Sequence, residues 1–290
     1  MPSTRDIRRR IKSVKNTAQI TKAMQMVASS KMRKAQMAAL AGRPYAALMN
    51  NMLSQVAGTS GDFSHPFMQA RDVKKRLVIL VSTDKGLCGA LNSNLTREAA
   101  KFDKATTSFI CAGRKGSQFV ARTKRELLAE FTYKDSPLFA EARAISKFAR
   151  ELFLKGEVDQ VQFVATRYIN TLSQQPAVVE FLPIGEIKAL QISGVDTGSE
   201  LAGDTPEVLF EPSPEAVLSY LIGHYLNIFV YRVLLEAKAS EQSARMVAMT
   251  NATDNATALI KDLALEYNKL RQGNITKELL EIAGGQLGNG

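Results

Sequence analysis

The chain has little cysteine, no tryptophan and few residues that break helices. Its 290 residues include two cysteines, nine prolines and eighteen glycines. Two cysteines, Cys88 and Cys111, are too few for a disulfide scaffold and suit a reducing compartment. The scarcity of glycine and proline argues against large disordered regions. With 45% apolar and 23% charged residues, the composition is that of an ordinary soluble folded protein.

Catalytic and membrane-crossing signals are also missing. No apolar run approaches the roughly 20 residues that cross a bilayer. The N-terminus lacks the apolar core and cleavage site of a secretory signal. It is basic and amphipathic like a mitochondrial presequence, but a long motif of its own disfavours that interpretation. The two histidines, His65 and His224, have no Cys or His at ligand spacing, and no catalytic triad stands out. We therefore predict no catalytic residue, no metal site and no cofactor.

Positive charge is concentrated at the start of the chain. The net charge is +10, and residues 1–34 hold ten basic residues against Asp6 alone. A basic helix attracts nucleic acid, anionic lipid or an acidic protein surface. Charge alone does not choose among these partners.

The first segment, from Ser3 to about Ala57, has the periodicity of a long helix. Its only strong breaker is the Gly42-Arg43-Pro44 step. Apolar or small residues recur with a 4-3 spacing, interrupted by Gln25, at Ile7, Ile11, Val14, Ala18, Thr21, Ala28, Met32, Ala35 and Ala39. Small residues along such a seam let a second helix approach closely.

The last segment has the same periodicity. Ser213 is a candidate N-cap, Pro214 suits the first helical position, and the Gly-rich tail from Gly284 marks an end. The seam is apolar at first (Val217, Leu221, His224, Ile228, Tyr231, Leu235), polar next (Lys238, Gln242, Arg245) and then apolar again (Met249, Ala252, Ala256, Leu259, Leu263, Leu270). Both helices are longer than an ordinary domain is wide, so we expect them to pair with each other, antiparallel, with the C-terminal helix extending beyond its mate.

The middle of the chain alternates strands with helices. The expected strands are 76–82, 107–112, 159–165 and 177–183, with a weaker one at 128–133, and the expected helices are 89–103, 114–125 and 138–155. This order predicts a Rossmann-like α/β domain with a mostly parallel sheet. The predicted organisation is a coiled-coil helix at 1–57, the α/β domain at 75–210 and a second coiled-coil helix at 211–284.

One loop of that domain lies where α/β proteins bind phosphates. Val81–Gly89 follows a strand and leads into a helix. It matches neither the dinucleotide fingerprint nor the P-loop pattern. A structural loop with glycines for tight backbone geometry is therefore the favoured interpretation, with nucleotide binding as the alternative.

An apolar stripe lies about 100° away from the seam of the first helix. Ile20, Met24 and Val27 form it. The stripe either broadens the contact within the chain or is covered by another protein. The basic residues around it suggest that such a partner surface is acidic.

Three segments resemble one family closely. They are Ile11–Met32 (IKSVKNTAQITKAMQMVASSKM), Ser82–Asn92 (STDKGLCGALN) and Ala239–Ile282, which contains ASEQSARMVAMTNATDNA and NKLRQGNITKELLEI. Their order and spacing resemble those of the gamma subunits of F-type ATP synthases, over the whole chain.

The resemblance implies a non-catalytic rotor shaft. In this family the two terminal helices form an antiparallel coiled coil inside a hexamer of alternating alpha and beta subunits, whose beta subunits carry the catalytic residues. The α/β domain stands outside, against the epsilon subunit and the c-ring. One shaft per complex is implied, touching the membrane only through partners. Its rotation couples proton flow to ATP synthesis or hydrolysis through contacts that differ with angle.

The resemblance also implies contact residues. Those facing the alpha/beta hexamer are Met24, Arg245, Arg271, Gln272, Thr276 and Glu278. We expect the polar seam positions Lys238 and Gln242 to bond to beta-subunit loops together with them. Those at the foot, near the c-ring and epsilon, are Arg43, Tyr45, Phe210 and Glu211, with Pro44 beside them. Many relatives have Arg at the position of Lys85, and the chain lacks the cysteine-bearing insertion of chloroplast homologues. We expect a bacterial protein on the cytoplasmic side of the inner membrane, with the matrix side of the mitochondrial inner membrane as the alternative.

Two other classes of function remain as alternatives. A basic coiled-coil protein that binds nucleic acid would show a strongly salt-dependent DNA affinity. A nucleotide-dependent enzyme built on the α/β domain would bind ATP or NAD in a titration.

Overall fold

The structure is a computed structural model that describes residues 3–42, 44–45, 48–49, 52, 65–184 and 213–287. The side chains of residues 214–215 and 281–287 are outside that description. The chain forms two compact units. We name them the shaft unit, Met1–Ser29 with Arg245–Gly290, and the sheet unit, Ser30–Ala244.

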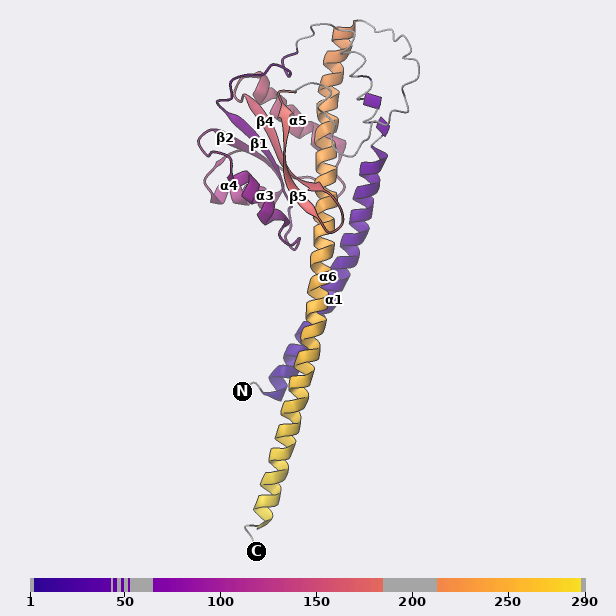
Figure 1. The fold of residues 1–290 in the computed structure, drawn as a ribbon, viewed down its shortest axis with the longest axis vertical. Helices are drawn as coiled ribbons and strands as arrows, with labels where there is room; N and C mark the ends of the chain where they lie inside the picture. Colours follow the sequence, from indigo (N-terminus) through magenta and orange to yellow (C-terminus); the bar gives the residue numbers. More distant parts are fainter. Residues whose placement is uncertain are drawn as a thin grey trace. The chain divides into compact units, whose positions relative to one another are not determined.

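Two long helices dominate the chain (Figure 1). Helix α1 spans Thr4–Ala41 and α6 spans Pro214–Leu287. Helix α1 ends immediately before Gly42, at the predicted breaker, and α6 continues past Gly284. Residues 57 and 210 lie outside the described residues, so the predicted domain limits stay predictions.

The sheet unit holds a five-stranded sheet in the order β3-β2-β1-β4-β5. The strands are β1 (Arg76–Val81), β2 (Thr107–Ala112), β3 (Glu126–Phe131), β4 (Gln160–Tyr168) and β5 (Gln174–Leu182). Strands β1 to β4 pair in parallel, and only β5 is antiparallel, on β4. The predicted fold class is confirmed: long terminal helices packed together, and a mostly parallel central sheet.

Helices cover both faces of the sheet because the strand side chains alternate in direction. Leu77 and Ile79 of β1 pack into the core that contains α5 (Phe139–Leu154) and the start of α6. Val78 and Leu80 point to the other face, which α3 (Leu91–Ala100) and α4 (Arg114–Arg122) cover. The first stretch of α6 is thus a core helix of the sheet unit.

That packing accounts for the hydropathy of α6. Residues Ala216–Leu280 contain an 18-residue window of mean hydropathy 1.3, apolar enough by length and composition to cross a membrane. The expectation that no such stretch exists was therefore too strict. Half of the window is buried inside the protein. Leu218, Leu226 and Phe229 of this helix lie in the sheet core, which is the ordinary role of an apolar helix in a folded domain.

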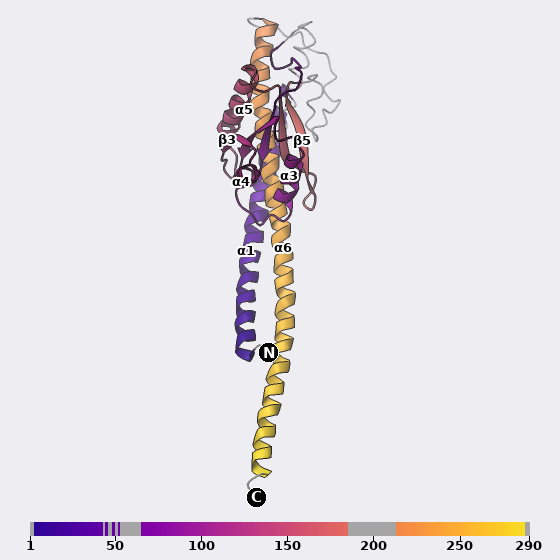
Figure 2. The same cartoon turned by 90° about the vertical axis from the view of Figure 1, so that its left-hand side faces the viewer.

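In the shaft unit, α1 and α6 run antiparallel along the predicted seam (Figure 2). Arg8 Nη2 donates to the Tyr267 hydroxyl at 2.6 Å, and the Thr21 and Thr253 hydroxyls are 2.7 Å apart. The residue later in α1, Thr21, contacts the residue earlier in α6, Thr253, so the two helices are antiparallel. Ile7, Thr21 and Ala28 are buried on this seam, as their spacing predicted.

Candidate functional site

The loop after β1 is held by hydrogen bonds within the chain. Ser82 Oγ donates to the Gly113 carbonyl at 3.0 Å and accepts from the Gly116 N–H at 2.7 Å. Asp84 Oδ1 accepts from the Arg114 N–H at the start of α4. A Cβ at Gly113, where φ is +106°, would lie 2.3 Å from the Ser82 carbonyl oxygen, so this close approach requires glycine. These contacts are typical of a structural loop, which was the interpretation favoured over nucleotide binding.

The two cysteines lie in the protein interior. Both are buried, and neither forms a disulfide. The Asn92 Nδ2 lies 3.3 Å from Cys88 Sγ. Burial, with Glu130 as a second cause, raises the pKa of the Cys111 thiol to about 12. A thiol with that pKa is protonated at neutral pH, so Cys111 is a poor nucleophile.

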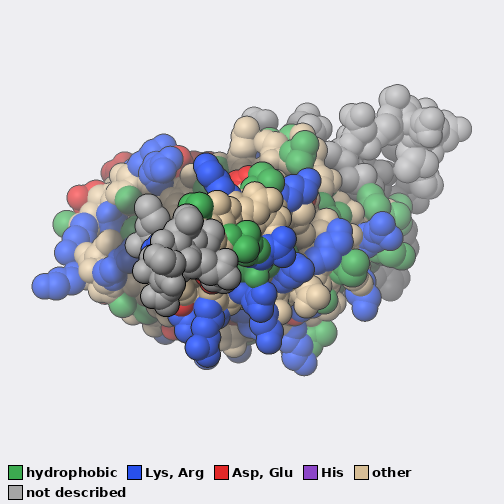
Figure 3. All heavy atoms as spheres, turned by 90° about the horizontal axis from the view of Figure 1, so that it is seen from below, with side chains coloured by type: hydrophobic (Ala, Val, Ile, Leu, Met, Phe, Trp, Pro, Cys, Tyr) green, Lys and Arg blue, Asp and Glu red, His purple; other side chains and the backbone are tan. Residues whose placement is uncertain are grey.

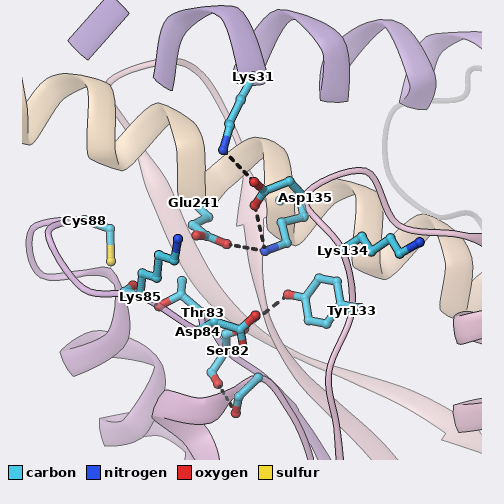
Figure 4. Close-up of polar contacts among 12 residues, drawn as sticks. Lys31, Ser82, Thr83, Asp84, Lys85, Cys88, Tyr133, Lys134, Asp135 and Glu241 are labelled. Carbon is cyan, nitrogen blue, oxygen red and sulfur yellow. Dashed lines mark hydrogen bonds and ion pairs between the residues drawn. The ribbon is translucent and has the colours of Figure 1, made fainter. Parts of the chain in front are cut away.

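Next to the loop lies a cluster of charged side chains around one tyrosine that we call the ionic clasp: Lys31, Asp135, Lys238 and Glu241 with Tyr133 (Figure 4). The Lys238 ammonium donates to Glu241 at 2.9 Å and lies 3.8 Å from Asp135. Lys31 of α1 donates to the other oxygen of Asp135. The clasp therefore joins α1, the β3–α5 loop and α6.

The aromatic ring of Tyr133 completes the clasp. The Lys238 Nζ lies 4.6 Å from its centroid, which is cation–π distance. The Tyr133 hydroxyl donates to the Ser82 carbonyl at the end of β1. Burial raises the pKa of Tyr133 well above its ordinary value, so it stays a neutral donor. The hydrogen bond from Lys31 lowers the pKa of Asp135, which keeps that carboxylate charged.

On this point one sequence interpretation is wrong. Lys238 and Gln242 were expected to interrupt the seam in order to meet beta-subunit loops. In the structure they are 2% and 3% exposed. Lys238 is held within the chain by Glu241, Asp135 and Tyr133 because a buried charge requires partners. No sequence spacing predicted Asp135 or Tyr133, although the i, i+3 spacing of Lys238 and Glu241 was a signal for that pair.

A second set of polar contacts holds α6 against the turn between β4 and β5, and we call it the hairpin clasp. Glu236 accepts from the Tyr168 N–H at 3.0 Å. The Ser243 hydroxyl donates to the Thr171 carbonyl at 2.8 Å, and the Ser240 hydroxyl to the Thr166 carbonyl at 3.4 Å. In Figure 1 the β4–β5 hairpin lies against α6. Burial raises the pKa of Glu236.

The predicted hexamer contacts fall in the shaft unit. Met24 is half-buried, whereas Ile20 and Val27 of the same stripe are 60% and 54% exposed. Arg245 is half-buried, at the first position of the α6 part of this unit. Every described side chain from Arg271 to Leu280 is exposed, and this stretch includes Gln272, Thr276 and Glu278.

The end of α6 is exposed because its mate is too short. Helix α1 begins at Thr4, and Arg8 already pairs with Tyr267. Four residues before Arg8, α1 begins at Thr4, and in an antiparallel pair Thr4 faces α6 about four residues after Tyr267. Beyond about Arg271, α6 therefore has no facing α1 residue. The expected extension of the C-terminal helix beyond its mate is present in the structure.

Basic side chains line the α1 part of the shaft unit. Exposed positions there are Arg5, Arg8, Arg9, Arg10, Lys12, Lys15 and Lys22. Figure 3 shows a face of the molecule on which Lys and Arg side chains are more prominent than Asp and Glu. The charge excess seen in the sequence is thus at the surface, where it can act on a partner.

The predicted foot contacts are described only in part. Tyr45 is 50% exposed, and its hydroxyl lies 2.8 Å from His224 Nε2 on α6. Pro44 is exposed. Arg43, Phe210 and Glu211 lie outside the described residues. Within the described ranges, no group of three or more His, Cys, Asp or Glu side chains is arranged to hold a metal ion.

Comparison with known proteins gives matches along the whole chain. The family model described as ATP synthase matches residues 3–287. The ATP synthase gamma chain of Opitutus terrae is 50% identical over 291 residues, which cover 99% of this chain and 98% of that one. The gamma chain of Methylacidiphilum infernorum is 43% identical, with full coverage of both chains.

Solved structures are similar as well. A chain from the central stalk and c-ring structure of the Tetrahymena thermophila mitochondrial ATP synthase has a TM-score of 0.60 and 28% identity, covering 80% of this chain and 99% of that one. A chain from the Euglena gracilis mitochondrial enzyme has a TM-score of 0.67 at 22% identity, covering 98% of this chain and 93% of that one. At that identity the second likeness concerns the fold alone.

Proposed function

Because this chain belongs to the ATP synthase gamma chain family, we propose that its rotation couples proton flow through the c-ring to ATP synthesis or hydrolysis. As a gamma chain it is a non-catalytic subunit of the central stalk of an F-type ATP synthase. Catalysis belongs to the partner subunits. The chain contributes a surface whose contacts with the partner subunits differ from one rotational angle of the shaft to another.

The exposed end of α6 carries this proposal. Arg271, Gln272, Thr276 and Glu278 offer donors and acceptors on a helix that has no facing α1 residue. Exposed polar groups on a rigid helix make directional hydrogen bonds with whatever surrounds it. A bond made at one shaft angle and lost at another shifts the rotational equilibrium by its own free energy. We assign these residues, with Arg245, to contacts with beta-subunit loops.

The Ile20-Met24-Val27 stripe supports a second contact with the hexamer. Ile20 and Val27 are mostly exposed, so the stripe does more than broaden the intrachain seam. Exposed apolar side chains gathered on one side of a helix mark a protein interaction site. We assign Met24 to the alpha/beta hexamer, with the surrounding Lys and Arg residues facing acidic groups.

The remaining partners are the c-ring and the epsilon subunit. The Tetrahymena thermophila chain belongs to a structure of the central stalk and c-ring, and the full-length curated relatives cited above are bacterial gamma chains. We infer one gamma chain per complex, bound peripherally on the cytoplasmic side of the inner membrane. We assign Arg43, Tyr45, Phe210 and Glu211 to the foot that meets the c-ring and epsilon.

The test replaces the polar groups of the exposed end. The variant Arg271→Ala/Gln272→Ala/Thr276→Ala/Glu278→Ala is assembled with its alpha and beta subunits, and single-molecule rotation is recorded. Each charge-assisted hydrogen bond contributes roughly 1.5–3 kcal/mol, so we expect dwell times to lengthen about tenfold or more. The control is Lys155→Ala/Glu157→Ala, which removes exposed charges from the sheet unit. Dwell times and torque equal to those of the control would refute the assignment.

A further inference from the structure

One segment of α6 is enclosed on every side. Each of the eight side chains from Ala237 to Ala244 is at most 9% exposed, and we call this segment the collar segment. A helix residue projects at roughly 100° from the one before it. Eight consecutive residues therefore point in all directions around the axis, and complete burial means that protein surrounds the helix.

The enclosed side chains are polar or small rather than bulky and apolar. Earlier in α6, Phe229, Val230 and Leu234 pack into the sheet core. The collar segment then reads Ala-Lys-Ala-Ser-Glu-Gln-Ser-Ala. Apolar packing is non-directional, whereas a hydrogen bond weakens steeply when its angle changes. A surface of alanines and hydrogen-bonded polar groups therefore resists rotation of the helix about its axis more than an apolar surface does.

The two clasps hold the helix from opposite sides. Glu236, Ser240 and Ser243 follow an i, i+4, i+7 spacing, which places them on one face, and they bond to the β4–β5 hairpin. Lys238 and Glu241 lie roughly half a turn away around the axis, and Lys238 bonds toward the β3–α5 loop. Rotation of α6 in either direction therefore stretches bonds on both faces.

Helix α1 is tied into the same arrangement. Lys31 bonds to Asp135 of the ionic clasp, and the Gln36 amide donates to the Tyr168 hydroxyl beside the hairpin clasp at 2.8 Å. The collar segment ends at Ala244, where the sheet unit also ends, and α6 continues as one helix to Leu287.

We propose that the collar segment fixes the rotational setting of α6 in the sheet unit, with Lys238 as the positioning residue. Torque then passes between α6 and the rest of the sheet unit without rotation of the helix about its own axis. The proposal rests on the proposed function, since a shaft needs such a fixing point only if it transmits torque. Lys238 acts through Glu241, Asp135 and Tyr133 and touches no reacting group. This role is separate from the contacts assigned to the hexamer.

The test separates positioning from folding. Lys238→Met alone leaves Glu241 buried without its lysine. Lys238→Met/Glu241→Leu replaces the pair by apolar groups of similar size, which is often neutral for stability. A merely structural pair predicts that the double variant regains wild-type behaviour in every respect. Our proposal predicts that it regains the melting temperature but not the angular stiffness. Ser240→Ala/Ser243→Ala removes only two hydroxyls from the opposite face, so it tests the proposal with little risk to folding.

Stiffness is measured on the assembled complex. The hexamer is fixed to a surface, and a rod is attached to the sheet unit through Lys104→Cys. Position 104 is exposed, whereas Cys88 and Cys111 are buried. The variance of the rod angle is recorded with hydrolysis paused. We expect the variance to rise roughly twofold in the Lys238→Met/Glu241→Leu variant, because directional bonds are lost on one of two faces. Lys147→Met, which removes the lysine of a surface ion pair with Glu151, is the matched control.

Each outcome decides a different question. A variance at the control level in both the Lys238→Met/Glu241→Leu and Ser240→Ala/Ser243→Ala variants overturns the collar proposal while the proposed function stands. A wild-type complex that hydrolyses ATP without turning the rod overturns the proposed function, and the collar proposal with it. A wider variance in either double variant with a normal melting temperature supports the collar proposal.

Discussion

Two stretches of α6 share helical geometry and a polar composition but have opposite surroundings. From Ala237 to Ala244 every side chain is buried, and from Arg271 to Leu280 every side chain is exposed. In the first stretch the polar groups bond to the chain's own hairpin and β3–α5 loop. In the second, the Thr276 hydroxyl donates to the Gln272 carbonyl of the same helix, and contacts with other subunits are our proposal. A polar residue on a long helix therefore indicates a function only after its surroundings are known.

The largest difference between the two stretches is expected in the free energy of unfolding when one basic side chain is removed from each. We expect Lys238→Ala to lower the free energy of unfolding by about 3–5 kcal/mol, because it removes one partner of a buried ion pair. Arg271→Ala is expected to change it by no more than about 0.5 kcal/mol, because the side chain is exposed. Urea unfolding of the full chain, followed by circular dichroism, measures both. Equal effects of the two substitutions would mean that burial does not distinguish these stretches.

Much of this fold follows from local sequence patterns. The run Leu77–Val81 is apolar at every position, which indicates a strand buried on both faces, and β1 is that strand. The 4-3 spacing from Ile7 to Ala39 gave the seam of α1, and the length difference of the two helices predicted the exposed end of α6. These features depend on periodicity and length, which a sequence displays directly.

The ionic clasp was not predictable in the same way. Lys238 appeared on the seam as a polar interruption, and seam position alone suggested a partner outside the chain. Its actual partner Asp135 lies in a loop far away in the sequence, and only the fold brings the two together. The antiparallel direction of β5 was missed for a related reason, since the apolar pattern of a strand does not encode its direction. The subunit contacts themselves remain predictions.

A smaller effect is expected in the seam of the shaft unit. The Thr21 and Thr253 hydroxyls are 2.7 Å apart, and Thr21 is only 9% exposed. Thr21→Val removes the hydroxyl that contacts both Thr253 and the Ala18 carbonyl. This loss of neutral hydrogen bonding should lower the free energy of unfolding by about 0.5–1.5 kcal/mol. Thr21→Val/Thr253→Val should restore part of that loss, since no threonine is left facing an apolar side chain. A double-mutant cycle on the full chain measures the coupling. A coupling of zero would mean that the two hydroxyls do not interact in solution.

The smallest expected effect concerns acid pH at the ionic clasp. The hydrogen bond from Lys31 lowers the pKa of Asp135 in the folded chain below its ordinary value of 3.8. A group whose folded pKa is depressed stabilises the fold above its unfolded pKa, and this contribution is lost as the pH falls through the folded pKa. The Asp135 side chain is 56% exposed, so solvent screening keeps its contribution small. Asp135→Asn should therefore reduce stability slightly near neutral pH and flatten its decline below about pH 4. Unfolding free energies of both proteins from about pH 6 down to about pH 3 measure this, with Asp103→Asn as the comparison because Asp103 accepts only local bonds from the Ala105–Thr106 turn. If Asp135→Asn left the pH profile unchanged, its carboxylate would contribute nothing to the clasp, and Glu241 would be the only carboxylate that holds Lys238.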